Sequence, residues 1–191
     1  MDKNAERIIP DSLQRIETGL LGSGPHLILA SRPFHKAESL NLLLHNANCP
    51  ALVLDFDLMY SGYVASNMIQ ARDNIQIIRP RVEDWNNTLR HILEKMCQER
   101  LLIIIDSFNG FHNMYSDMDS ARFVNASLML LAFVGRFKKC PVIAMALARK
   151  SKKDKWILMP GGRQIISPKN SNLYTVSKDG DTLCLTQCNH A

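Results

Sequence analysis

The stretch LLIIIDSFNGFHNMY, residues 101–115, carries the strongest fold signal in this 191-residue sequence. Its first five residues are all aliphatic, so the segment has no polar side that could face water. Such a run is typical of a strand buried on both faces in the middle of a parallel sheet. Asp106 follows at the carboxyl end of this strand, where open α/β sheets bind ligands. An aspartate there is also a common turn former or helix cap, so both interpretations stay open.

The composition is that of an ordinary globular protein. Hydrophobic residues make up 46% and charged residues 21% of the chain, which fits a single folded domain. We expect a lead-in segment over residues 1–23 and a core domain over residues 24–191. The apolar runs are too short to cross a bilayer, and the first residues have no signal-peptide pattern. We therefore expect an intracellular protein, in the cytoplasm or nucleoid or in a eukaryotic nucleus, with no membrane partner.

Strand and helix patterns alternate along most of the chain. Short apolar runs predict strands over His26–Ala30, Ala51–Asp55, Ile75–Ile78, Leu101–Asp106 and Val142–Leu147. Helical spacing predicts helices over Leu40–His45, Tyr63–Ala71, Val82–Arg100 and Met118–Lys138, and a short one near the start through Ile9, Leu13, Ile16 and Leu20. Asp179-Gly180 between two alternating segments, 172–177 and 181–187, predicts a closing hairpin. The sequence therefore predicts an α/β three-layer sandwich with a mainly parallel central sheet and a C-terminal β-hairpin.

The loop after the first strand is where a phosphate-binding P-loop would lie. That motif needs two glycines, a lysine and a hydroxyl in the pattern GxxxxGK[ST], so that backbone N–H groups and the lysine hold the phosphates. Residues 30–37 keep only the lysine, Lys36. His35 stands at the second glycine position, and Ala37 has no oxygen for Mg²⁺. The alternative interpretation is a loop with a solvent-exposed lysine next to a helix.

The order of these parts resembles the RecA-type ATPase core, especially its archaeal RadB-like and KaiC-like members and the eukaryotic recombinase paralogues. The resemblance covers roughly residues 24–187. Its most specific piece is the aliphatic strand followed by Asp106-Ser107, which matches the family's Walker B segment, whose aspartate orients Mg²⁺ through water. The resemblance implies ATP and Mg²⁺ as cofactors, with Lys36, Asp106 and Ser107 as the residues that bind them.

The second piece of the resemblance is Asp55-Phe56-Asp57. Recombinases have a glutamate there that positions the attacking water, and Asp57 stands at its place with a side chain one methylene shorter. The family's polar sensor falls near Ala146, which cannot sense a phosphate. Phosphoryl transfer is catalysed mainly by positioning and charge stabilisation. Because these departures affect both, we expect a degenerate ATPase with little or no hydrolysis.

A dense basic stretch follows the strand that ends at Leu147. Five basic residues face one acid there: Arg149, Lys150, Lys152, Lys153 and Lys155. Recombinases have a DNA-contacting loop in this place, and such a density of charge favours phosphate contacts. Trp156 is positioned to stack on a base, and Arg163 adds to the same surface. The alternative is a solvated loop after which Trp156 begins the next core strand.

Three functions compete at this stage. The first is an accessory protein of homologous recombination or DNA repair that binds DNA, RNA or a RecA-fold partner. The second is a non-catalytic subunit of an Elongator-like complex that acts on transfer RNA. The third is an active ATPase with an atypical P-loop. The resemblance implies a homo- or hetero-oligomer in the first two, because the nucleotide face of this fold normally lies between subunits.

Overall fold

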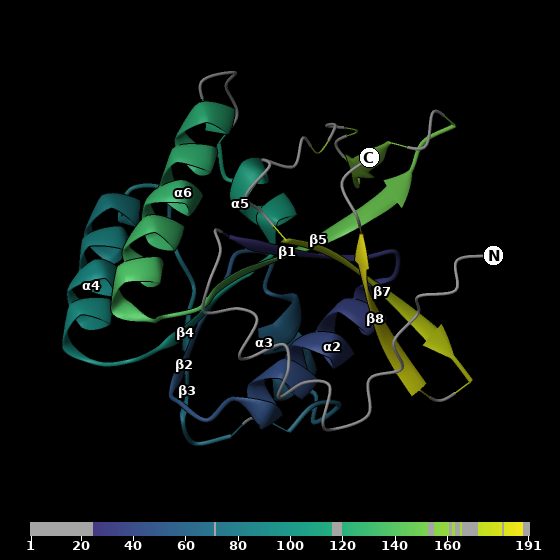
Figure 1. The fold of residues 1–191 in the computed structure, drawn as a ribbon, viewed down its shortest axis with the longest axis horizontal. Helices are drawn as coiled ribbons and strands as arrows, with labels where there is room; N and C mark the ends of the chain where they lie inside the picture. The colour runs from purple at the N-terminus through teal and green to yellow at the C-terminus, as the bar shows by residue number, and fades with distance from the viewer. Residues whose placement is uncertain are drawn as a thin grey trace.

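A computed structural model describes residues 25–70, 72–115, 120–152, 155–160, 162, 165, 172–180 and 182–188. The predicted lead-in segment, 1–23, lies outside these residues. The described chain forms an eight-stranded sheet with helices on both faces (Figure 1). The predicted α/β sandwich with a mainly parallel sheet is confirmed.

The strand order places the opening stretch at the centre of the sheet. The order is β3-β2-β4-β5-β1-β7-β8, and the short strand β6 pairs with β5. The strands are β1 His26–Ala30, β2 Ala51–Asp55, β3 Ile75–Ile78, β4 Leu102–Asp106, β5 Val142–Lys150, β6 Trp156–Leu158, β7 Asn172–Asp179 and β8 Thr182–Cys188. All neighbours from β3 to β7 run parallel, whereas β7 and β8 are antiparallel. The predicted closing hairpin is thus confirmed, with a left-handed Gly180 (φ +59) in its turn.

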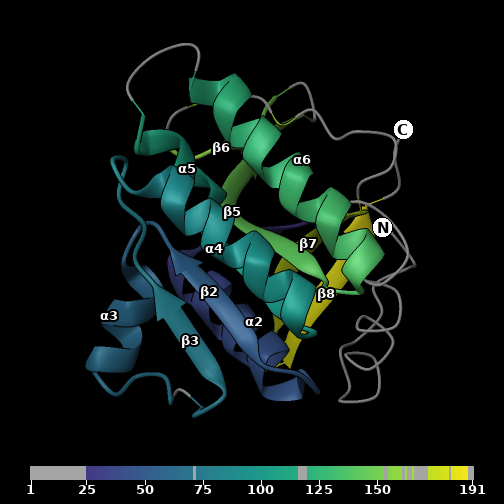
Figure 2. The same ribbon diagram turned by 90° about the vertical axis from the view of Figure 1, so that its left-hand side faces the viewer.

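Helices cover the two faces of the sheet in pairs (Figure 2). The helices are α2 Pro33–Asn46, α3 Met59–Ala65, α4 Trp85–Gln98, α5 Phe108–Asn113 and α6 Ser120–Lys138. Helices α2 and α3 pack on one face, and α4 and α6 lie on the other. Each face has its own apolar core, one around Leu40 and Val53 and one around Ile103 and Leu131. Burying two aliphatic layers stabilises the fold, because each fully buried side chain contributes roughly 1.5–3 kcal/mol.

Two sequence-based predictions near the first strands were wrong, and both matter for the site. Helix α2 begins at Pro33, not at Leu40, because the fixed φ of proline suits the first helical position. Helix α3 begins at Met59 and contains Gly62, where the sequence predicted a break and then a helix over Tyr63–Ala71. Both helices therefore start closer to their strands than the sequence pattern indicates.

Two further predictions beyond β4 were also wrong. The sequence predicted no helix between the strand Leu101–Asp106 and the helix Met118–Lys138, but the short helix α5 lies there. Its first residue follows Ser107, and the Ser107 Oγ caps it by accepting from the N–H of Gly110. Strand β5 continues to Lys150, and β6 follows in antiparallel pairing. The start of the basic stretch is therefore on a strand. In the described part of the chain, no helix is long and apolar enough to cross a membrane.

Candidate functional site

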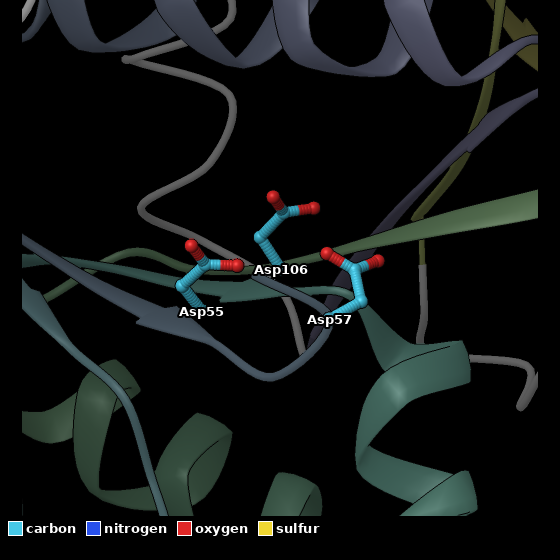
Figure 3. Close-up of side chains that lie close together, drawn as sticks. All are labelled: Asp55, Asp57 and Asp106. Atoms are coloured by element: carbon cyan, nitrogen blue, oxygen red, sulfur yellow. The ribbon is translucent and has the colours of Figure 1, made fainter. Parts of the chain in front are cut away.

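Three carboxylates meet at the carboxyl ends of the central strands. Asp55 ends β2 and Asp106 ends β4, and the two residues are partners in the parallel ladder. Asp57 follows two residues after Asp55, in the connection to α3. One oxygen from each of the three lies within 4.8 Å of the others. Figure 3 shows the three side chains converging from the two strand ends. The sequence-based expectation of an acidic site at this edge thus corresponds to an observed cluster.

Lys36 lies inside this cluster. Its Nζ donates to Asp57 Oδ2 at 3.1 Å and also to Asp106 Oδ1, and its side chain has no exposed surface. The alternative interpretation of Lys36 as a solvent-exposed lysine was therefore wrong. Burial acts to lower the pKa of Lys36, but Asp106 and Asp57 outweigh it and hold the pKa above its usual value. The Lys36 side chain is thus an ammonium paired within the protein.

The Asp57 carboxylate also accepts hydrogen bonds from Ser107 and Met59. Ser107 Oγ donates to Asp57 Oδ2 at 2.6 Å, and the N–H of Met59 donates to Asp57 Oδ1 at 3.2 Å. A Cβ on Gly110 would lie 3.0 Å from the backbone nitrogen of Asp57, so α5 passes close to this residue. Lys36, Asp57, Asp106 and Ser107, which the sequence predicted as site residues, are therefore brought together. They bond mainly to one another.

Asp55 belongs to a second network that the sequence did not reveal. Asp55 Oδ2 accepts from the N–H of Ser61 at 2.8 Å and from the Ser61 hydroxyl, and Arg79 Nε donates to Ser61 Oγ at 3.3 Å. Tyr60, the neighbour of Ser61, is fully buried. Burial, together with Asp106 and Asp55, raises the pKa of Tyr60 to about 12. The start of α3 therefore stabilises the Asp55 carboxylate with uncharged hydrogen-bond donors.

The cluster carries more negative than positive charge. Burial raises the pKa of Asp106 to about 6, and the charges of Asp57 and Asp55 add to this rise while Lys36 opposes it. Two buried carboxylate oxygens, Asp55 Oδ1 and Asp106 Oδ2, have no hydrogen-bond partner among the described residues. One ammonium is shared by two carboxylates with a third close by, so a proton on Asp106 becomes less costly.

The residues present do not fit the nucleotide-bound Mg²⁺ that the resemblance implies. Carboxylate oxygens suit Mg²⁺, but Lys36 already occupies one oxygen of Asp57 and one of Asp106. The position of the P-loop hydroxyl is Ala37, which is fully buried. A lysine that binds these two carboxylates is also unable to reach out to a phosphate. The cation at the centre of the cluster is therefore the Lys36 ammonium.

The connection between β1 and α2 has no room for a phosphate cradle. Only Ser31 and Arg32 separate the strand from the helix. The N–H of Lys36 donates to the carbonyl of Arg32 at 3.1 Å, and Pro33 has no N–H. In a P-loop a long glycine-rich turn points several free N–H groups at the phosphates. Within 30–37 most of that backbone is already in the helix, which agrees with the missing glycines.

Asn109 is a second feature that the sequence did not reveal. It lies on α5 and is buried, and its amide nitrogen donates to the carbonyls of Leu147 at 2.9 Å and Met159 at 2.6 Å. The N–H of Leu147 donates to Asn109 Oδ1 at 2.8 Å. Ala146, at the predicted sensor position, is a fully buried β5 residue. Asn109 therefore connects the end of β4 to the base of the β5–β6 hairpin.

The basic stretch forms the far end of that hairpin. Arg149 and Lys150 end β5, and Lys152 and Lys155 lie in the turn; all four are exposed. The turn is closed by the N–H of Ser151 donating to the carbonyl of Lys155 at 2.8 Å. Two other predicted contact residues, Lys153 and Arg163, lie outside the described residues.

Trp156 has a structural role at this end of the sheet. It begins β6 opposite Lys150 and packs partly buried against the core of the α4–α6 face. The Nζ of Lys150 lies 5.6 Å from the centre of the indole ring, within the range of a cation–π contact. Trp156 therefore begins the next strand, as the alternative interpretation had it. Its predicted contact with a base stays a prediction.

A solved structure with a TM-score above 0.5 shares this fold. The crystal structure of the RadB recombinase superposes with a TM-score of 0.54 at 11% sequence identity, over 83% of this chain and 78% of that chain. A second solved structure, an ATPase domain, gives a TM-score of 0.47 at 12% identity, over 82% and 70%. The flagellar accessory protein FlaH from Methanocaldococcus jannaschii gives 0.48 at 14% identity, over 98% and 88%. No family model and no curated protein matches the sequence. The chain has a RecA-like fold.

Proposed function

We propose that this protein is a RecA-fold accessory protein of homologous recombination or DNA repair, with little or no ATP hydrolysis. The observation that carries the second half is the position of Lys36. Its ammonium is buried between Asp57 and Asp106, which in an ATPase of this fold would serve the attacking water and Mg²⁺. A nucleotide would have to break the buried Lys36–Asp106 pair and the partly buried Lys36–Asp57 pair to reach the lysine, and removing one partner of a buried pair costs about 3–5 kcal/mol.

The binding half of the proposal rests on the β5–β6 hairpin. Its end projects beyond the sheet and carries four exposed basic side chains, Arg149, Lys150, Lys152 and Lys155. Exposed lysines and arginines at this density favour a polyanion over an apolar partner. The fold shared with a protein named a recombinase supports DNA as the polyanion and a RecA-fold protein as a partner.

Calorimetry with Mg²⁺-ATP and measurement of phosphate release by the full chain test the expected lack of ATP binding and hydrolysis. We expect no saturable heat at millimolar nucleotide and no turnover above that of buffer, with or without single-stranded DNA. Lys36→Ala serves as the matched variant. Turnover that saturates with ATP and is abolished in Lys36→Ala would contradict the proposal and establish the atypical ATPase.

Competition between nucleic acids tests the proposed binding role. The accessory role in recombination predicts that single-stranded DNA competes with transfer RNA for the full chain at comparable concentrations. Preferential binding of transfer RNA, with Elongator subunits recovered in a pull-down and no recombinase, would support the Elongator-like alternative. Recovery of a recombinase supports the proposal.

A further inference from the structure

Helix α6 is apolar on its outer side as well as on its inner side. Half of the large hydrophobic residues that are exposed in the described chain lie on this one helix: Phe123, Met129, Leu130, Phe133 and Phe137. Phe133 is 62% exposed and Phe137 is 69% exposed. The two rings contact each other edge to face with centroids 4.9 Å apart. A helix that is hydrophobic all round is normally covered on both sides.

The exposed residues form a stripe opposite the buried side. Ala126, Leu130, Phe133 and Phe137 follow one another at intervals of four, three and four residues, so they share one side of the helix. The inner side packs through Val124, Leu128 and Leu131. We call the four exposed residues the outer stripe. On α4, which packs next to α6, the outward positions are polar or charged, among them Asn87, Arg90 and Glu94. The apolar surface that no described element covers is therefore one helix wide.

The charges beside the outer stripe limit what can cover it. The sequence of α6 contains no acidic residue, and Arg122, Arg136 and Lys138 are exposed on it. A second copy of α6 packed on the first would bring these basic residues together across the contact. An apolar helix that carries some acidic residues has no such repulsion.

The N-terminal segment of the same chain has the matching pattern. Ile9, Leu13, Ile16 and Leu20 are also spaced by four, three and four residues, and both sets span twelve residues. As a helix, that span is about 18 Å long in each case. Residues 1–24 contain four acids and three bases, and Glu17 follows Ile16 directly. This segment therefore has the size, spacing and charge that the outer stripe requires.

The short connection to the fold also allows this segment to reach α6. The described chain begins at Pro25, and His26 pairs with Ile143 of β5, five residues after the end of α6 at Lys138. The four residues 21–24 between Leu20 and Pro25 include two glycines and extend to at most about 14 Å. A helix over residues 9–20, joined to Pro25 by this connection, can therefore reach the C-terminal end of α6.

We propose that residues 9–20 of the same chain pack as a helix on the outer stripe of α6 and form an additional layer of the domain. The proposal does not depend on nucleotide or nucleic-acid binding. It assigns the covering of α6 to the chain itself, in preference to a second copy or another protein.

Limited proteolysis of the full chain tests this proposal. Trypsin cleaves after Arg15, which lies within the proposed helix, and mass spectrometry follows the rate of that cut. The rate tracks the population of the undocked segment when opening is fast. We expect Phe133→Glu with Phe137→Glu to speed the cut by about tenfold or more, since two charges replace the centre of the contact. Leu13→Glu should have the same effect from the other side.

The controls separate docking from general loosening and from dimerisation. Met68→Glu and Val82→Glu change residues of similar exposure away from α6, and we expect neither to alter the rate of the cut. Dilution of the wild-type chain should leave the rate unchanged. The proposal is overturned if wild type and the Phe133→Glu, Phe137→Glu variant are cut equally fast. Protection that disappears on dilution would overturn it too, because the occupant would then come from a second copy.

Discussion

The Nζ of Lys36 lies 3.1 Å from Oδ2 of Asp57. Lys36 follows β1 in the chain and Asp57 follows β2, and the two strands β4 and β5 lie between β1 and β2 in the sheet. Helix α2 begins two residues after β1, and Lys36 on its first turn donates to Asp106 at the end of β4 and to Asp57 after β2. A lysine in this fold normally reaches outward to a phosphate, according to the resemblance, whereas here it points inward. The ion pairs of Lys36 are therefore expected to contribute to folding.

Substitution of Lys36 by methionine should destabilise the protein. Lys36→Met keeps most of the side-chain volume but leaves Asp57 and Asp106 buried together without a cation. We expect the free energy of unfolding to fall by about 3–5 kcal/mol, measured by urea denaturation. The double variant Lys36→Met, Asp106→Asn should recover a large part of that loss, since it removes a carboxylate as well. Equal stability of Lys36→Met and wild type would mean that the pair contributes nothing to folding.

Replacement of Asn109 should loosen the base of the β5–β6 hairpin. Asn109→Leu leaves the N–H of Leu147 and the carbonyl of Met159 without their Asn109 partner, whereas the Leu147 carbonyl keeps the N–H of Met159 at 2.9 Å. A buried group left unpaired costs about 1–3 kcal/mol, and these two groups are partly buried, so we expect a fall in the urea midpoint. The amide of Leu147 should also exchange with deuterium faster. Asn86→Leu, at an exposed position on α4, is the matched control and should leave both measurements unchanged.

Much of the sheet could be predicted because its signals are local. The aliphatic run before Asp106 indicates a strand whatever surrounds it, and Asp179-Gly180 indicates a hairpin on its own. Helix starts were less certain, since Pro33 suits either a loop or the first position of a helix. That single ambiguity decided whether Lys36 would be exposed in a loop or buried on the first turn of α2.

The hydrogen bonds within the site could not be predicted, because the bonded residues are distant from one another in the sequence. Asn109 bonds to residues 38 and 50 positions away, and Ser107 bonds to Asp57 across 50 positions. A polar residue after a strand gives no sign of which backbone groups it will meet. Asp106 was recognised because it ends a buried strand, where open α/β sheets bind ligands, and Asp57 because of the resemblance to recombinases. The hydrogen bonds between Asp55 and Ser61 of α3 had no sequence signal.

A change at Leu58 should stabilise the protein. Leu58 directly follows Asp57 and has a left-handed backbone with φ of 59°, and its side chain is 56% exposed. This conformation costs a residue with a branched side chain roughly 1–2 kcal/mol, and asparagine adopts it more easily. We expect Leu58→Asn to raise the free energy of unfolding by about 0.5–1 kcal/mol. Val82 is also exposed and apolar but does not have a left-handed backbone, so Val82→Asn should not raise the free energy of unfolding. A gain of equal size in both variants would refute the backbone explanation.

Reversal of charge on the β5–β6 hairpin should weaken binding to single-stranded DNA and reduce its salt dependence. Lys150→Glu, Lys152→Glu and Lys155→Glu together remove the described lysines of the hairpin, and each lost phosphate contact lowers the slope of log affinity against log salt by about 0.7 for a single strand. Fluorescence anisotropy at several salt concentrations gives both quantities. Trp156 remains in place, so the strand pairing of the hairpin is retained.

The matched control has the same change in net charge at a distance from the hairpin. Arg72→Glu, Arg81→Glu and Arg90→Glu alter exposed residues around β3 and α4. If binding depended only on the net charge of the protein, both triple variants would lose affinity equally. We expect the hairpin variant to lose both affinity and slope, and the control to keep the slope of the wild type. The slope measures how many phosphates the basic side chains neutralise. An unchanged slope in the hairpin variant would therefore place the contact elsewhere.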